Sequence, residues 1–261
     1  MNFAALARRA LLLLGLPVVL VAVWWFATIN SQSFFFPPLR DILATFGETW
    51  FEGRIVGDVL PSLVRLTVGY LLALVIGISV GVVVGSSARL RAVLEPVLEF
   101  FRAIPPPVLV PIIILFAGIE NSMKVLVIVS GCVWPVLLNT IEGVRGLDEV
   151  LRDTAGCYRL GRRSRLLNLT LRGASPQIAA GARQALSIGI ILMVISEMFA
   201  ASNGIGFTII QFQRSFAIPQ MYSGIILLGL LGIAIALVFR AVEARTMSWY
   251  TGLRRSQRGE G

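Results

Sequence analysis

The residues of this sequence that come nearest to a known chemical motif are two glycines, Gly156 and Gly161, in the stretch GCYRLGRRS (156–164). Their spacing fits the phosphate-binding pattern G-x-x-x-x-G-K-[ST], but Arg162 and Arg163 stand where that pattern has Lys and Ser or Thr. A phosphate loop also needs a buried strand before its first glycine, whereas a helical pattern precedes Gly156. We therefore predict that this stretch binds no nucleotide.

Other residue types that do chemistry are scarce. Histidine is absent, which removes the commonest general base and metal ligand. Cys132 lies in an apolar run and Cys157 in an arginine-rich segment, without the spacing of metal ligands. A membrane-embedded enzyme would need clustered polar groups, and we single out only Glu197 as deep in an apolar run. We predict no catalytic residue, no metal site and no cofactor bound by this chain.

The apolar content of the chain indicates a protein that crosses a membrane several times. Hydrophobic residues make up 56% of 261 residues and the mean hydropathy is +0.83, which is unlike a soluble domain. A crossing helix needs about 20 mostly apolar residues. We predict an all-α polytopic membrane protein, one domain over residues 1–261, with six transmembrane helices at about 10–29, 62–85, 94–118, 123–141, 177–200 and 221–240. The first run is too long for a cleaved signal core, so we expect an uncleaved helix.

Glycine and proline modify three of these predicted helices. Gly77, Gly81 and Gly85 recur every fourth position, a spacing that lets two membrane helices approach closely. Prolines interrupt the stretch 94–118, so we expect a broken helix that faces the interior of the bundle; they are Pro105, Pro106, Pro107 and Pro111. Ser175 followed by Pro176 predicts the start of the fifth helix, as N-cap and first helical residue.

The positive charge of the chain predicts its orientation. The formal net charge is +9, with Lys124 as the one lysine among 23 basic residues. Because the basic residues sit between apolar runs, we expect retention on the cytoplasmic side and no nucleic-acid binding. The prediction is six crossings with both termini cytoplasmic, and a cytoplasmic loop over about 142–176. The arginines counted as cytoplasmic are Arg8, Arg9, Arg89, Arg91, Arg145, Arg152, Arg159, Arg162, Arg163, Arg165, Arg172, Arg240, Arg245, Arg254, Arg255 and Arg258.

The loop that holds the opening stretch carries a short amphipathic pattern, LDEVLRDTAGCYRL. One helical face collects Leu147, Val150, Leu151, Thr154, Ala155 and Tyr158. We expect a helix with acidic residues in its first turn and a break at Gly161. Such a helix could lie on lipid head groups or dock into a groove of a partner protein.

At this loop the sequence resembles the membrane subunits of bacterial ABC importers, the binding-protein-dependent permeases. Their cytoplasmic loop has the form E-A-A-x-x-x-G, and an ungapped reading places Asp153, Thr154 and Ala155 on E-A-A. The sequence departs from the family's form at two positions. Arg159 occupies the position of the glycine, although Gly161 could supply the turn if the loop is shifted. Arg172 occupies the position of a proline that comes later in the family's loop. The segments RAIPPPVLVPIIILFAGIENSMK and SEMFAASNGIGFTIIQFQRSF resemble the nitrate, sulfonate, taurine and bicarbonate branch.

The resemblance implies a type I importer fold and a non-catalytic permease subunit in the bacterial inner membrane. It implies that the loop inserts into a separate ATPase subunit, with Asp153, Thr154, Ala155, Tyr158, Arg159 and Gly161 as the coupling residues. The implied partners are two ABC ATPase subunits, which bind ATP and Mg²⁺, a second permease copy or close paralogue, and an extracytoplasmic substrate-binding protein. The implied cargo is a small anion such as alkanesulfonate, taurine, nitrate or bicarbonate. A neutral solute of the thiamine-precursor type remains an alternative cargo. A passive channel is a second alternative, but it would not need a loop shaped for docking.

Four residues are candidates for the translocation path: Arg102, Pro105, Glu197 and Asn203. Arg102 could pair with Glu99 one helical turn earlier or could attract an anion at the mouth of the broken helix. Glu197 lies inside the predicted fifth helix, and an acid at membrane depth is expected to face the bundle interior. It could line the path, act as a gate or tie helices together.

Overall fold

The computed structural model describes residues 3–199 and 201–250, with side chains from Gly15 onward, and every regular element in these ranges is a helix. The first half consists of α1 (Phe3–Thr28), α2 (Leu39–Phe51), the π-helix η1 (Ile55–Val59), α3 (Leu60–Gly85), α4 (Ala88–Ala103), the 3-10 helix η2 (Pro106–Leu109) and α5 (Val110–Ala117). The second half consists of α6 (Asn121–Arg145), α7 (Glu149–Cys157), α8 (Arg162–Ser164), the π-helix η3 (Arg165–Leu171), α9 (Arg172–Phe199), α10 (Ile205–Arg214) and α11 (Ile218–Thr246). The all-α prediction is confirmed for these residues.

Four continuous helical stretches within the described residues are long and apolar enough to cross a membrane: 55–85, 121–145, 162–199 and 218–246. The pair α4 and η2–α5 would make a fifth crossing if its two bent halves count as one. The predicted crossing at about 10–29 falls on α1, where the side chains of Arg8 and Arg9 lie outside the described ones. Ala200, at the end of the predicted fifth crossing, and Arg254, Arg255 and Arg258 also lie outside the described residues.

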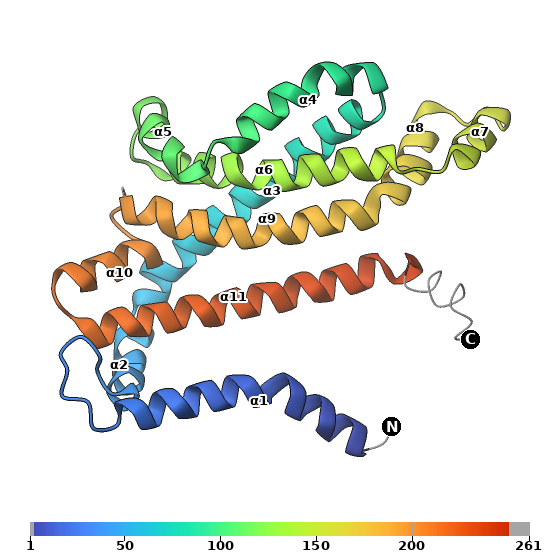
Figure 1. Cartoon of the computed structure of the whole chain (residues 1–261). Coiled ribbons are helices and arrows are strands. Elements are labelled where there is room, and N and C mark those ends of the chain that lie inside the picture. The colour runs from blue at the N-terminus through green and yellow to red at the C-terminus, as the bar shows by residue number, and fades with distance from the viewer. Residues whose placement is uncertain (1–2, 200, 251–261) are drawn as a thin grey trace.

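The centre of the molecule is a layer of three helices, α3, α6 and α9 (Figure 1). Along α3, a Cβ added at Gly77, Gly81 or Gly85 would come within 2.6–2.9 Å of the side chains of Val136, Thr140 and Val144 on α6, respectively. These contacts are closer than van der Waals distance, so the two backbones meet at the glycines. Because both sets of numbers rise together, α3 and α6 run parallel.

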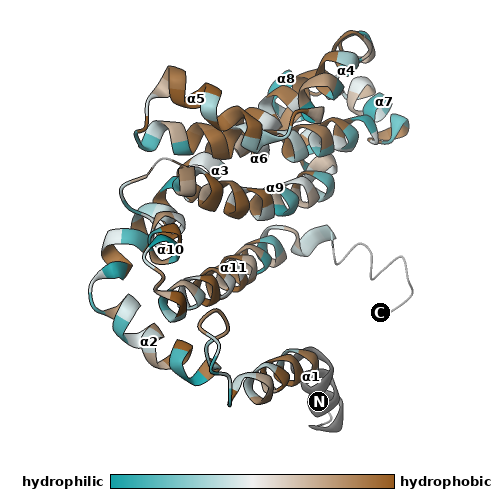
Figure 2. Ribbon diagram, turned by 60° about the vertical axis from the view of Figure 1, so that its left-hand side comes forward, coloured by the Kyte–Doolittle hydropathy of each residue, from teal (hydrophilic) through white to brown (hydrophobic). Residues whose placement is uncertain are grey.

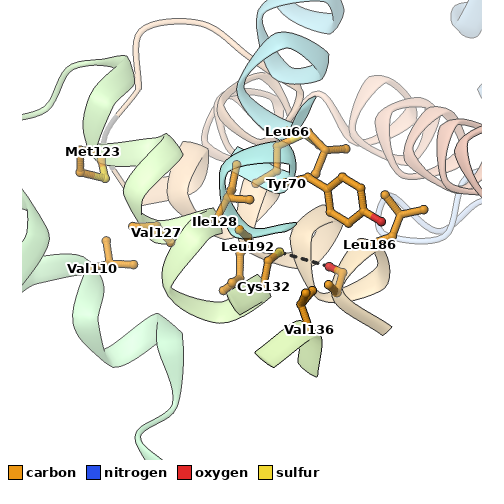
Figure 3. Packing of buried hydrophobic residues seen from close by; sticks show 13 residues of the cluster. Leu66, Tyr70, Val110, Met123, Val127, Ile128, Cys132, Val136, Leu186 and Leu192 are labelled. Atoms are coloured by element: carbon orange, nitrogen blue, oxygen red, sulfur yellow. Dashed lines mark hydrogen bonds between the residues drawn. The ribbon is translucent and has the colours of Figure 1, made fainter. Parts of the chain in front are cut away.

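The helices α6 and α9 pack antiparallel through a second set of small residues. A Cβ on Gly131 of α6 would lie 2.2 Å from Leu192, and one on Gly181 of α9 would lie 2.6 Å from the carbonyl oxygen of Pro135. Between the three helices lies an apolar core that includes Leu66, Tyr70, Val127, Ile128, Cys132, Val136, Leu186 and Leu192 (Figure 3). Tyr70 donates its hydroxyl to the carbonyl oxygen of Ala182 at 3.0 Å, so its polar end is satisfied within the core.

The stretch 94–118, predicted as one broken crossing, is two helices bent by 81°. The break follows Ala103, where consecutive prolines remove backbone donors and disfavour helix in the residues before them. The expectation that this stretch faces the bundle interior is wrong for α4 but holds for one side of α5, where Val110 is fully buried in the central core and Ile113, Ile114 and Ala117 pack against it. No residue of α4 is buried, and Leu115 and Phe116 of α5 are 83% and 88% exposed.

The predicted helix start at Ser175 and Pro176 is also wrong, because the helix begins well before it. Helical backbone continues from residue 162 through η3 into α9, and Pro176 lies inside α9. Pro176 lacks the N–H that would bond to the carbonyl oxygen of Arg172, and the Ser175 hydroxyl donates to that oxygen instead at 2.8 Å. The Ser175 hydroxyl therefore replaces the missing backbone donor, and the helix continues where the sequence pattern predicted its N-cap.

The helices α1 and α11 lie outside this layer (Figure 1). The apolar 18-residue stretch of α11 has no buried residue within the chain, and hydrophobic residues follow it along its length (Figure 2). At its first turns α11 is fastened to α2, where Trp50 Nε1 donates to Ser223 Oγ at 3.0 Å. Near the same place the rings of Trp24 on α1 and Tyr222 are 6.5 Å apart. Most of the α11 surface is left for lipid or another chain.

Candidate functional site

Polar and charged residues gather at the two ends of the helical layer. We call the end with α7, α8 and the last turns of α3 and α6 the loop end, and the opposite end, with α10 and the first turns of α3 and α6, the α10 end (Figure 1).

At the loop end, α7 starts from a side-chain cap. Asp148 Oδ1 accepts a hydrogen bond from the backbone N–H of Val150 at 2.8 Å, so Asp148 is the N-cap and Glu149 is the first helical residue. This arrangement satisfies one of the free donors of the first turn and places an acidic residue near the positive end of the helix dipole. The sequence predicted a helix here with acidic residues at its start.

Two contacts, one from α7 and one from Leu147 just before its N-cap, hold this segment against the ends of the central helices. Arg152 Nη2 donates to the carbonyl oxygen of Val144 at 2.6 Å and to that of Arg145 at 3.3 Å, which are among the last carbonyls of α6. Leu147 lies against Gly173 at the start of α9, where a Cβ would be 2.1 Å from the leucine side chain. A displacement of α7 would therefore act on both α6 and α9.

The predicted apolar face of α7 divides into two parts. Ala155 is buried against the chain, with 5% of its surface exposed. Val150 and Tyr158 are 69% and 75% exposed, and Leu151 is also exposed. The helix thus packs against its own chain through a small side chain, and its large apolar side chains remain exposed.

The end of α7 has left-handed backbone at Arg159, with φ of 50°. The backbone N–H of Leu160 bonds to the carbonyl oxygen of Ala155 at 3.1 Å, and that of Arg159 bonds to Gly156 at 2.9 Å. This pair of bonds is a Schellman motif, in which glycine usually occupies the left-handed position. Gly161, with φ of −59°, does not supply the turn.

The backbone of residues 156–164 differs from that of a phosphate-binding loop. Gly156 lies within α7, and no strand precedes it in the described chain. Gly161 is the N-cap of the short helix α8. A strand-loop-helix phosphate cradle is therefore not formed by this stretch.

At the α10 end, Glu197 of α9 is fully buried. Its Oε1 accepts from Ser62 Oγ and from Arg65 Nη1, each at 2.7 Å, and its Oε2 accepts from the backbone N–H of Gly206 at 3.0 Å. A buried carboxylate with one charged and two neutral donors is well compensated. Glu197 ties α3, α9 and α10 together.

Arg65 of α3 is the residue at this end that sequence reasoning missed. Its guanidinium also donates to Asn121 Oδ1 at 2.8 Å, to the carbonyl oxygen of Asn203 at 3.1 Å and to Asn203 Oδ1. The charge pattern of the sequence indicated no role for Arg65 beyond its absence from the arginines counted as cytoplasmic. The signal available in the sequence was its spacing, because Arg65 lies four residues before Gly69. Gly69 is at the contact between α3 and α6, where an added Cβ would be 2.8 Å from Ile128. It therefore belongs on the buried face.

Three backbone donors at the start of α10 are taken by side chains of other elements. Asp58 Oδ1 accepts from Gly204 N, Ser62 Oγ from Ile205 N, and Glu197 Oε2 from Gly206 N, each at 3.0 Å. Gly204 has φ of 122°, and a Cβ there would lie 2.5 Å from the Glu197 carboxyl carbon. This position therefore requires glycine.

The four predicted path candidates fall in two places. Glu197 and Asn203 meet at Arg65. Arg102 pairs with Glu99 on the exposed surface of α4 at 2.5 Å, and Pro105 begins the break after α4. Neither joins the buried cluster. In the described chain there is no group of three His, Cys, Asp or Glu residues that could hold a metal ion.

Comparisons with known proteins agree with this architecture. Residues 73–248 match the family described as binding-protein-dependent transport system inner membrane component. The chain is 29% identical to the taurine transport system permease protein TauC of Escherichia coli, over 94% of this chain and 92% of that protein. It is 28% identical to the putative aliphatic sulfonates transport permease protein SsuC of Bacillus subtilis, over 90% and 86%.

A third relative covers less of the chain. The bicarbonate transport system permease protein CmpB of Synechococcus elongatus is 31% identical over 67% of this chain and 63% of that protein. The family match spans more than half of the residues and includes Gly77, Gly81, Gly85, α7 and Glu197. The chain belongs to the inner membrane components of binding-protein-dependent transport systems and is a non-catalytic permease subunit.

Proposed function

We propose that this chain forms the membrane pathway of an ATP-driven importer for a small anion that carries an oxyanion group, such as an alkanesulfonate, taurine or bicarbonate. The relatives named above are described as transporting taurine, aliphatic sulfonates and bicarbonate, and these solutes share a compact oxyanion. The observation that carries the proposal is α7, an amphipathic helix with exposed apolar side chains that is attached to the ends of two crossing helices.

The proposed topology has six crossings with both chain termini on the cytoplasmic side. The parallel packing of α3 and α6 supports it, because the chain between Gly85 and Asn121 must then return across the membrane once. Only α4, η2 and α5 are available for that return. Counting α1 as the first crossing places the start of α1, α7 and the end of α11 on one side, and the basic loop puts that side in the cytoplasm.

The proposed assembly contains two permease chains, identical or closely related, two ATPase subunits and an external binding protein. The wholly unburied apolar stretch of α11 supports a second membrane chain. ATP and Mg²⁺ belong to the ATPases. Closure of the ATPases would push α7, and Arg152 and Leu147 would pass that movement to α6 and α9, so that access alternates by rigid-body rocking.

The docking of α7 can be tested by co-purification with candidate ATPases. Val150→Glu places a charge on the exposed apolar surface and is expected to abolish the complex, because the charge would be desolvated in the groove. Leu167→Glu, on an exposed residue of η3 in the same loop, is the matched control and is expected to keep the complex. An unchanged complex with Val150→Glu would remove the docking role.

Ala155 is less suited to this experiment. Its side chain is buried within the chain, so a charge there would first disturb the seat of α7. Cargo is tested separately, by uptake of labelled taurine and bicarbonate into proteoliposomes that contain the whole transporter. Uptake of a neutral solute with exclusion of both anions would contradict the anion assignment.

A further inference from the structure

A polar cavity of about 320 Å³ lies at the α10 end, between the first turns of α3 and α6 and the connection from α9 to α10. Its lining includes Arg65, Lys124, Asn121, Ser202 and Asn203. We propose that this cavity binds a single oxyanion group of the sulfonate, carboxylate or bicarbonate class, with Lys124 as the main cationic ligand. The proposal deepens the function above by naming where the anionic cargo is first held by the permease.

The position of Lys124 is unfavourable for a cation in two respects. It is the fourth residue of α6, where the positive end of the helix dipole disfavours a cation. It is also only 3% exposed, and buried charges are normally paired. Its ammonium donates to the carbonyl oxygens of Ile119 at 2.9 Å and Glu120 at 3.4 Å. Within the described part of the chain it forms no ion pair with a carboxylate.

An ammonium has three donors, so a bound anion could take the one that the two carbonyls leave. A buried cation with no carboxylate partner in the described chain breaks a local rule, and such violations are expected at functional sites. The choice of residue also fits, because lysine presents a compact charge to one oxyanion. Lys124 is the one lysine of this otherwise arginine-based sequence.

Arg65 supplies the second cation of the cavity, and it is 5% exposed. Its charge is balanced by Glu197, which is fully buried and bonds to it directly. The acidic residue that lines the cavity, Glu120, is exposed to solvent and meets Lys124 through its carbonyl oxygen. The other buried acid of this end, Asp58, does not line the cavity and pairs with Arg54. Lys124 is therefore the cation of the cavity without a carboxylate partner, which suits one oxyanion group.

Neutral donors complete the cavity. The α6 N-terminus has no side-chain cap, so its first backbone N–H groups remain available to an acceptor. Asn121, Ser202 and Asn203 add amide and hydroxyl groups. The cavity also lies at the end opposite α7, which in the proposed topology faces the binding protein that delivers cargo.

The direct test uses the permease–ATPase complex in nanodiscs, with thermal unfolding measured against added taurine, bicarbonate and inorganic sulfate. The wild-type complex is expected to gain stability with at least one of these anions, and Lys124→Gln is expected to lose that gain. Without anion, Lys124→Gln is expected to unfold at the same or a higher temperature, because it removes a cation from a helix N-terminus. A purely structural lysine would instead lower that temperature.

Two variants serve as controls. Lys124→Arg keeps the charge and is expected to retain part of the anion-dependent shift. Arg145→Gln removes an exposed cation that is paired with Glu142 at the loop end, far from the cavity, and it is expected to leave the shift unchanged. An equal shift in Lys124→Gln and in the wild-type complex would overturn the proposed site.

Uptake by the whole transporter in proteoliposomes separates this inference from the proposed function. Lys124→Gln is expected to raise the KM for a transported anion by about tenfold or more, the loss expected for one charge-assisted contact, while binding-protein-stimulated ATPase activity is retained. An unchanged KM would overturn the site and leave the importer assignment intact. If the transporter takes up none of the three anions but the Lys124-dependent shift persists, the cargo assignment is wrong and the site stands.

Discussion

Arg65 and Glu197 form a buried ion pair between α3 and α9, with Arg65 Nη1 and Glu197 Oε1 2.7 Å apart and side-chain exposures of 6% and 0%. The residues are 132 positions apart in the sequence. The pair also reaches α10 through Gly206 N and α6 through Asn121 Oδ1. One ion pair thus joins α3, α6, α9 and α10 at the α10 end.

Breaking this pair from one side is expected to be costly. Arg65→Met leaves the Glu197 carboxylate buried without its cation, and a loss of about 3–5 kcal/mol in unfolding free energy is expected. The double variant Arg65→Met with Glu197→Gln removes both charges and is expected to recover a large part of that loss. Denaturant unfolding in detergent measures both. Additive losses would show that the pair is not coupled.

The glycine seam between α3 and α6 is expected to reject any side chain. A Cβ at Gly81 would lie 2.6 Å from Thr140 Cβ, so Gly81→Val must separate the helices, at a cost of about 1–3 kcal/mol. Gly229→Val on α11 is the matched control, because a Cβ there meets nothing within 4 Å. Thermal unfolding of the detergent-solubilised chain should separate the two variants; equal stability would refute close contact at Gly81.

The left-handed residue at the end of α7 predicts a stabilising substitution. Arg159 has φ of 50°, a conformation that costs a residue with a side chain about 1–2 kcal/mol. Arg159→Gly removes that cost and is expected to slow hydrogen exchange of the α7 amides. Gly161→Ala is the control, since its φ of −59° and open surroundings admit a methyl group without strain. Faster exchange in Arg159→Gly would contradict this backbone assignment.

Cys157 reports the sidedness of the loop. It is exposed at the end of α7, whereas Cys132 is buried in the core. A membrane-impermeant maleimide is expected to label Cys157 in inside-out vesicles and not in intact spheroplasts, and Cys157→Ser is expected to abolish the signal. Labelling of Cys157 from outside would invert the proposed topology and with it the role of α7.

Regular patterns in the sequence were sufficient for several features. The apolar runs located the helices of the central layer, because each run must cover about 30 Å of hydrocarbon. The spacing of Gly77, Gly81 and Gly85 predicted a close helix contact, since residues four apart share one face. The amphipathic period located α7, although its ends and the position of its left-handed turn required the backbone.

Features that depend on distant residues could not be read in this way. The Ser175–Pro176 pattern indicated a helix start, yet the Ser175 hydroxyl repairs the bond that Pro176 removes and the helix continues. The partner of Arg65 is 132 positions away, and the spacing of Arg65 to Gly69 indicates only that it lies on the buried face of α3. Local periodicity records which face of a helix avoids water. The identity of the group on the opposite side is set by how the helices cross, and that crossing placed Glu197 against Arg65 and left Lys124 without a carboxylate.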